Sequence, residues 1–187
     1  MKNYQITQWC HHFIKEQIKP GDFCIDATAG NGYDTLLLCQ LVGEKGHVLA
    51  FDIQPDALKH TRERLAEANL QDRADLILDS HSHLSRYAVK DSISCIVFNL
   101  GYLPNGDHTI STRPQSTVKA LEESLLLLKK GGIISLCIYS GKDSGFKERD
   151  TVLAYLKTLE PRRFIVIMSQ YYNRPNDPPI PVLIVKL

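Results

Sequence analysis

The segment CIDATAGNGYDT, residues 24–35, decides the fold, because it joins an apolar run to a helical pattern through a short glycine-containing loop. The apolar run ends at Asp26, and Gly30 and Gly32 lie in the turn that follows. A strand, a glycine turn and a helix in this order open many nucleotide-binding α/β domains. The match to G-x-G-x-x-G is partial, because Thr35 occupies the position of the third glycine. The segment therefore predicts an α/β fold and leaves its ligand open.

The rest of the chain alternates apolar runs with helical patterns, which is typical of a doubly wound sheet with helices on both faces. The first five runs are nearly continuous in apolar residues, which predicts parallel strands covered on both faces. We therefore predict one α/β domain, residues 1–187, with a Rossmann-like and mostly parallel sheet. The expected strands are residues 23–27, 47–53, 74–80, 93–100, 132–139, 163–170 and 181–187. The expected helices are residues 4–18, 33–44, 55–70, 116–130 and 146–159.

Local signals define the ends of several elements. Residues 171–181, YYNRPNDPPIP, are too few for a crossover helix, so we expect the last two strands to form an antiparallel hairpin. Pro55 suits the first turn of its helix, and the Gly-Gly pair at 131–132 indicates the C-cap of the helix before the fifth strand. The N-terminal helix, within residues 1–19, is expected to pack on the sheet through Trp9.

Composition places the chain among ordinary globular proteins. It has 187 residues, a formal net charge of +1 and 43% hydrophobic residues. No apolar run approaches the roughly 20 residues that span a bilayer, and no signal-like segment opens the chain. We therefore expect a cytoplasmic protein without membrane contact. The five cysteines are an odd number without paired spacing, which argues against disulfides and zinc. One His-x-His motif at 81–83 is too little for a metal site, so none is expected.

The charged side chains beside the first loop distinguish among the ligands that it could hold. Asp26 and Asp34 flank the turn, and two carboxylates would repel a pyrophosphate at the N-terminus of the next helix. They suit S-adenosyl-L-methionine, which carries an ammonium and a sulfonium. Asp52 follows Gly32 by 20 positions, the spacing at which an acidic residue meets ribose hydroxyls in NAD and adenosyl ligands alike. S-adenosyl-L-methionine is the expected cofactor.

Further candidate contacts follow the strand ends, where ligands bind in open α/β sheets. Ile53 and Gln54 are placed to flank the adenine, and Asp79, Ser80 and His81 to read its edge. The expected cofactor-binding set is Asp26, Thr28, Gly30, Asn31, Gly32, Asp34, Thr35, Asp52, Ile53, Gln54, Asp79, Ser80, His81 and Asn99.

The fourth expected strand ends in a second motif, Asn-Leu-Gly-Tyr at residues 99–102. It resembles the Asn-Pro-Pro-Tyr motif of amino-group methyltransferases, with both prolines replaced. In that motif the asparagine accepts hydrogen bonds from the target amine and the aromatic ring stacks on its base, which is catalysis by positioning. Asn99 and Tyr102 are the expected catalytic residues. Tyr102, Asp107 and His108 are the candidate bases, the sequence does not choose among them, and methyl transfer does not require one.

Together these motifs resemble the class I S-adenosylmethionine-dependent methyltransferases over essentially the whole chain. More narrowly, DATAGNGYDT, FDIQP, DSH, FNLGYLP and YSG are similar to the YtqB-like (MnmM) family of small bacterial proteins described as rRNA methylases. The resemblance implies methylation of the 5-aminomethyl group of 5-aminomethyl-2-thiouridine at the tRNA wobble position. Lys142 stands where relatives often carry histidine. The resemblance also implies that Asn31, Asp34, Asp52, Gln54, Ser80 and His81 contact the cofactor, and that Asn99 and Tyr102 face the acceptor amine.

Because the net charge of the chain is close to zero, binding of a tRNA substrate would need a local basic surface. Basic and aromatic side chains on the loops after the strands suit the phosphates and unstacked bases of an anticodon loop. The alternatives are an rRNA methyltransferase, a small-molecule N- or O-methyltransferase, a nicotinamide oxidoreductase and a non-catalytic RNA-binding module. A homodimer is compatible with the sequence, which identifies no interface. The expected RNA-binding set is Arg113, Tyr139, Lys142, Lys147, Arg149, Tyr172 and Arg174.

Overall fold

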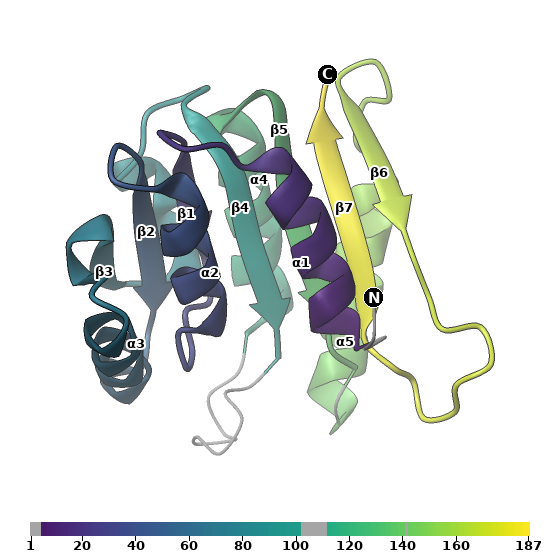
Figure 1. Ribbon diagram of the computed structural model, residues 1–187. Coiled ribbons are helices and arrows are strands. Elements are labelled where there is room, and N and C mark those ends of the chain that lie inside the picture. The colour runs from purple at the N-terminus through teal and green to yellow at the C-terminus, as the bar shows by residue number, and fades with distance from the viewer. Residues whose placement is uncertain (1–4, 102–111, 141) are drawn as a thin grey trace.

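The computed structural model describes residues 5–101, 112–140 and 142–187, and in the last range it describes side chains from residue 145 onward. Every strand in these ranges joins one seven-stranded sheet, in the order β3-β2-β1-β4-β5-β7-β6 (Figure 1). Each strand lies where the sequence places one. The strands are β1 (Phe23–Asp26), β2 (His47–Asp52), β3 (Ala74–Leu78), β4 (Ile93–Leu100), β5 (Leu128–Ile138), β6 (Phe164–Met168) and β7 (Ile180–Lys186).

The strand directions confirm the predicted fold class. Strands β1 to β5 pair in parallel, whereas β7 lies between β5 and β6 and runs antiparallel to both. The sheet is therefore doubly wound and mostly parallel, with an antiparallel C-terminal hairpin. The hairpin folds back so that its second strand pairs with β5, which leaves β6 as the edge strand.

Helices cover both faces of this sheet. In Figure 1, α1 crosses in front of the sheet, against β4, β5 and β7, and α4 and α5 lie behind it. Helices α1, α2 and α3 bury side chains in one hydrophobic cluster, and α4 and α5 bury theirs in another. Pro55 begins α3, as predicted. The helices are α1 (Ile6–Gln17), α2 (Tyr33–Val42), α3 (Pro55–Glu67), α4 (Pro114–Leu127) and α5 (Lys142–Leu156), with short 3₁₀ helices η1 (Gln71–Arg73) and η2 (His81–Arg86).

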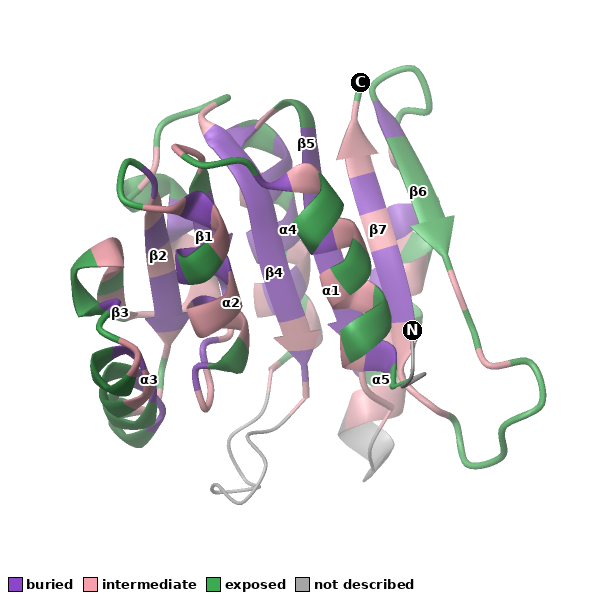
Figure 2. Cartoon of the chain, in the orientation of Figure 1, coloured by how far each residue is buried: buried purple, intermediate pink, exposed green. Residues whose placement is uncertain are grey.

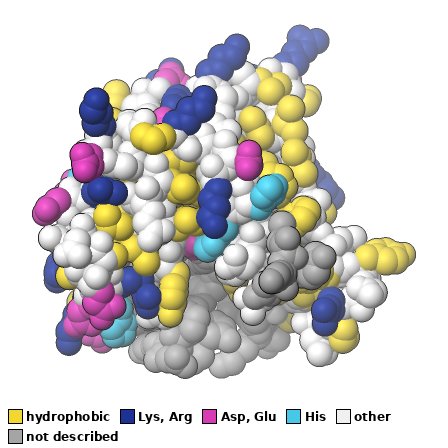
Figure 3. Space-filling view, viewed as in Figure 1, with side chains coloured by type: hydrophobic (Ala, Val, Ile, Leu, Met, Phe, Trp, Pro, Cys, Tyr) yellow, Lys and Arg dark blue, Asp and Glu magenta, His cyan; other side chains and the backbone are white. Residues whose placement is uncertain are grey.

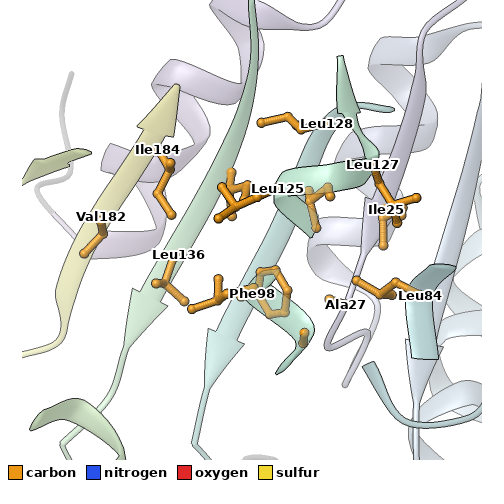
Figure 4. Packing of buried hydrophobic residues seen from close by; sticks show 14 of the residues in the cluster. Ile25, Ala27, Leu84, Phe98, Leu125, Leu127, Leu128, Leu136, Val182 and Ile184 are labelled. Atoms are coloured by element: carbon orange, nitrogen blue, oxygen red, sulfur yellow. The ribbon is translucent and has the colours of Figure 1, made fainter. Parts of the chain in front are cut away.

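The central strands are buried and the edge strands are not (Figure 2). Phe98 and Leu136, on the neighbouring strands β4 and β5, pack with Leu84 of η2 and Leu125 of α4 (Figure 4). This packing holds the carboxyl end of β4, and with it the start of the second motif, on a rigid base. The five cysteines are free thiols and four of them are buried, which confirms their interpretation as core residues.

Two expectations need correction. We expected β3 to be buried on both faces, and this prediction is wrong because β3 is an edge strand and Leu78 is 58% exposed. The C-cap at Gly131 is also wrong, since α4 ends at Leu127 and β5 begins at once. Gly131, with φ +76°, lies inside β5, next to a register shift between β4 and β5. Helix α1 packs on the sheet through the fully buried Ile14, and Trp9, 36% exposed, lines a hollow with Ile167 of β6 and Val182 of β7.

Candidate functional site

The loop after β1 is built around a buried carboxylate. Asp26 is fully buried, and it accepts hydrogen bonds from Thr35 Oγ1 (2.6 Å) and from the backbone N–H of Thr28 (3.2 Å). Burial, followed by repulsion from Asp34, raises the pKa of Asp26 to about 7. Thr35 is itself fully buried. Both side chains therefore shape the loop from inside instead of presenting polar atoms at its surface.

A second carboxylate, at the end of β2, holds the same loop from the other side. Asp52 accepts hydrogen bonds from the backbone N–H groups of Gly30 and Gln54, both at 2.9 Å. Burial raises its pKa, and these backbone donors oppose that change. Asp52 is only partly buried, and the next residue, Ile53, is 53% exposed. The structure thus brings Gly30, Asp52, Ile53 and Gln54 together, and their contact with the cofactor stays a prediction.

Helix α3 fixes the glycine turn from outside the motif. Gly32 has φ +77° and lies so close to α3 that an added Cβ would come within 2.8 Å of the Cα of Thr61. Arg64 Nε donates to the backbone oxygen of Asn31 (2.7 Å), and its guanidinium stacks on the ring of Tyr33 at 3.7 Å. The turn is therefore preformed by tertiary contacts.

The loop after β3 contains one residue with an unused polar atom. His81 Nε2 is buried without a hydrogen-bond partner among the described residues, and burial lowers the pKa of this imidazole to about 4. Asp79 differs, because His83 Nδ1 (2.8 Å), the Tyr87 hydroxyl (3.0 Å) and the Ser80 amide (2.7 Å) already surround its carboxylate. Hydrogen bonding from His83, more than any other cause, lowers the pKa of Asp79. His81 is thus available to a ligand, whereas Asp79 is already engaged.

The carboxyl end of β4 meets α1 and α2. The Asn99 side chain donates through Nδ2 to Asp34 Oδ2 at 2.6 Å, and its backbone N–H donates to Thr28 Oγ1 at 2.8 Å. Asp34 Oδ1 lies 2.5 Å from His11 Nε2 on α1. His11, Asp34 and Asn99 line one hollow beneath α1.

The second motif continues beyond the described residues, but its base is visible. Tyr102, Asp107 and His108 lie outside the described residues, so their expected roles stay predictions. Gly101 and Thr112, which bound this segment, hydrogen bond to each other. The Thr112 hydroxyl also donates to the buried Glu148 of α5 at 2.6 Å.

The expected RNA-binding residues lie on several loops and differ in their surroundings. Tyr172 is 94% exposed, and Arg174 stacks on Tyr171 at 5.9 Å, both on the connection between β6 and β7. Figure 3 shows basic and hydrophobic side chains together on this connection, at the lower right. Arg149 of α5 reaches toward the same connection, where its Nη1 lies 3.5 Å from Asp177 Oδ1.

The remaining members of that set vary in exposure. Arg113 and Lys147 are exposed. Tyr139 is half-buried, and this burial raises the pKa of its hydroxyl. The side chain of Lys142 lies outside the described residues. The structure therefore places Arg149, Tyr172 and Arg174 near one connection, and it leaves Lys142 undecided.

Sequence reasoning missed three residues that organise this site: His11, Arg64 and Glu148. The signal for His11 was its position in an amphipathic helix, which does not reveal the partner of a polar side chain. Arg64 and Glu148 lie in helices rich in charged residues, where such side chains usually face solvent. Glu148 is instead 2% exposed.

Comparison with known proteins identifies the family. The family model described as "Putative rRNA methylase" matches residues 48–185. The chain belongs to this family. It is 35% identical over 181 residues to the chloroplastic tRNA (mnm(5)s(2)U34)-methyltransferase of Arabidopsis thaliana, an overlap of 92% of this chain and 66% of that protein. The chain thus spans just under two thirds of that relative.

Two solved structures superimpose on this chain over their whole length or nearly so. A "putative rRNA-methylase" from Clostridium thermocellum superimposes with a TM-score of 0.97, at 44% identity and 100% coverage of both chains. SMU.1697c, a "putative methyltransferase" from Streptococcus mutans in complex with SAH, gives a TM-score of 0.89 at 36% identity, over 99% of each chain. The predicted membership among class I S-adenosylmethionine-dependent methyltransferases is confirmed, and S-adenosylmethionine is the cofactor of this class.

The described residues fit this cofactor. His81 Nε2, a buried nitrogen without a hydrogen-bond partner among the described residues, lies at the ligand-binding edge of the sheet. Asp52 and the preformed glycine turn lie beside each other at the carboxyl ends of β2 and β1, next to the point between β1 and β4 where the strand order reverses and ligands bind in doubly wound folds. The described residues contain no cluster of three or more metal-ligating side chains. Within the same ranges no helix is long and apolar enough to cross a bilayer.

Proposed function

We propose that this rRNA methylase relative transfers a methyl group from S-adenosylmethionine to the 5-aminomethyl group of a tRNA wobble uridine. The orientation of the Asn99 side-chain amide is the observation that supports an amine as the methyl acceptor. A carboxylate oxygen only accepts hydrogen bonds, so the atom of Asn99 facing Asp34 must be its NH₂ nitrogen. The carbonyl oxygen of the same amide then points away from Asp34. Among the described residues it has no partner, and it can accept an N–H of the substrate.

The chain's own residues act by positioning. S-adenosylmethionine, when bound, supplies the electrophilic methyl group. Asp52 would hold its ribose hydroxyls, His81 its adenine, and the turn around Gly30 its methionine portion. Asn99 accepts one N–H of the acceptor, which turns the nitrogen lone pair toward the methyl group. Alignment of this kind lowers the barrier without a change in the protonation of Asn99.

The tRNA substrate is supported by two observations. The Arabidopsis relative, at 35% identity, is named for position U34 of tRNA. The connection between β6 and β7 adds exposed basic and aromatic side chains near α5, which suit a single-stranded anticodon loop. An rRNA substrate is the second candidate, because the family description names rRNA.

The deciding experiment is methyl transfer from labelled S-adenosylmethionine to tRNA that carries the unmethylated aminomethyl group, followed by nucleoside mass spectrometry. We expect one added methyl on the wobble nucleoside. Purified rRNA in a parallel reaction tests the second candidate. Asn99→Ala should lower turnover about 100-fold, while its affinity for S-adenosylhomocysteine stays within about threefold of wild type. Label that appears in rRNA and not in tRNA would reject the tRNA proposal.

A further inference from the structure

The N-terminal helix α1 contributes a side chain to the proposed acceptor site. His11 and Asp34 are both largely buried, with side chains 16% and 15% exposed. The two residues are 23 positions apart, and their contact joins α1 to the first turn of α2. Figure 1 shows α1 in front of the sheet, alongside β4, the strand that carries Asn99. The helix therefore closes one side of the site.

Three side chains form a chain of hydrogen bonds with a fixed direction. Both Asp34 oxygens accept, one from His11 Nε2 and the other from Asn99 Nδ2. His11 must therefore carry its hydrogen on Nε2. A carboxylate held by two donors cannot rotate without losing one of them, so its orientation depends on His11. The orientation of the Asn99 amide depends in turn on Asp34.

The imidazole of His11 is the one basic side chain among the described residues that line this hollow. The other members are apolar or uncharged, apart from Asp34 itself: Thr7, Cys10, Ile14, Val97, Phe98, Asn99, Ser135 and Cys137. Asp34 also raises the pKa of the buried Asp26 by repulsion, so the region already carries an excess of negative groups. Among the described residues, His11 is thus the one side chain besides Asn99 that donates a hydrogen bond to Asp34.

We propose that His11 is a positioning residue for methyl transfer. It holds Asp34, Asp34 holds the NH₂ of Asn99, and the Asn99 carbonyl oxygen is thereby directed at the acceptor amine. This inference rests on the proposed amine acceptor. It assigns to α1, which lies outside both sequence motifs, a part in turnover instead of a purely structural one.

The test compares His11→Leu, which removes the donor, with His11→Gln, whose amide nitrogen can replace Nε2. His11→Leu should lower kcat for tRNA methylation about 10-fold, with KM for tRNA and affinity for S-adenosylhomocysteine within about threefold. His11→Gln should recover most of this loss. The double variant His11→Leu/Asn99→Ala should be no slower than Asn99→Ala alone, because both changes break one chain of contacts. A multiplicative loss in the double variant, or equal activity of the Leu and Gln variants, would overturn the proposal.

A second readout does not need the substrate. The side-chain NH₂ signals of Asn99 in ¹⁵N-labelled protein, assigned by their loss in Asn99→Ala, report its hydrogen bond to Asp34. They should shift in His11→Leu and return toward wild type in His11→Gln, with both proteins folded by circular dichroism. If wild-type protein methylates no tRNA, the proposed function fails, while these signals still decide the role of His11. Unmoved Asn99 signals in His11→Leu would reject it.

Discussion

The buried carboxylate of Asp26 offers a quantitative test of the site's electrostatics. Burial and the neighbouring Asp34 raise its pKa from 3.8 to about 7. A difference of about three units corresponds to about 4 kcal/mol of unfolding free energy. That figure is an upper limit, because interacting carboxylates titrate as a pair.

The sign follows from proton binding. The unfolded chain loses the Asp26 proton near pH 4, whereas the folded protein keeps it until about pH 7. The stability contributed by this group is therefore complete below about pH 4 and is lost as the pH rises through about 7. Asp26→Asn removes the titration. Its amide can still accept from the Thr28 N–H and can donate to the Thr35 hydroxyl.

The assay is urea unfolding, followed by circular dichroism, of wild type and Asp26→Asn at pH values from about 4 to about 8. The unfolding free energy of the variant relative to wild type should rise with pH, by up to about 4 kcal/mol. Groups that do not interact with Asp26, including His81 with its lowered pKa, contribute equally to both proteins and cancel. Asp79→Asn is the control, because the pKa of Asp79 is lowered, so its linked change in stability falls below about pH 4 and its curve should run parallel to wild type over this range. If Asp26→Asn and wild type gave parallel curves, Asp26 would not carry a raised pKa.

Three further changes test the scaffold. Gly32→Ala should destabilise the protein more than Gly131→Ala. The two glycines have nearly the same φ, +77° and +76°, but only at Gly32 would an added Cβ meet another atom within 4 Å. We expect the unfolding free energy, measured by urea unfolding, to fall by about 1–3 kcal/mol more in Gly32→Ala. Glu148→Ala should cost about 2–4 kcal/mol, since two threonine hydroxyls lose an acceptor at 2.6 Å, and Glu148→Gln should recover part; equal stability of both variants would contradict this. Asp52→Asn should weaken S-adenosylhomocysteine binding at least about 10-fold in calorimetry, and unchanged affinity would remove its ribose role.

The fold could be predicted because its strands carry their own signal. Parallel strands buried on both faces read as apolar runs, and crossover helices separate them. What the sequence did not predict depends on distant pairing. The insertion of β7 beside β5, the exposure of Leu78 and the place of Gly131 inside β5 each follow from which strands become neighbours. The hydrophobic periodicity of one segment does not show which other segments will lie beside it.

The site shows the same division. Asp52 and Asn99 could be named because each ends a strand, and the ends of parallel strands gather at one edge of the sheet. His11 could not be named, because its contact with Asp34 comes from the packing of α1 on the sheet beside β4. Glu148 looked like a surface residue, and only the fold shows that two threonine hydroxyls satisfy it. Motifs identify residues on strand ends, whereas their supports come from elements far away in the chain.

Three carboxylates at one edge of the sheet explain which ligand the glycine turn accepts. Asp26 is held by hydroxyl and amide hydrogens, Asp52 by backbone amides, and Asp34 by His11 and Asn99. Among the described residues no lysine or arginine pairs with any of the three. A pyrophosphate would add negative charge beside Asp34, which already raises the pKa of Asp26 by repulsion. A sulfonium and an ammonium add positive charge instead, so the charges around this turn favour S-adenosylmethionine over a dinucleotide.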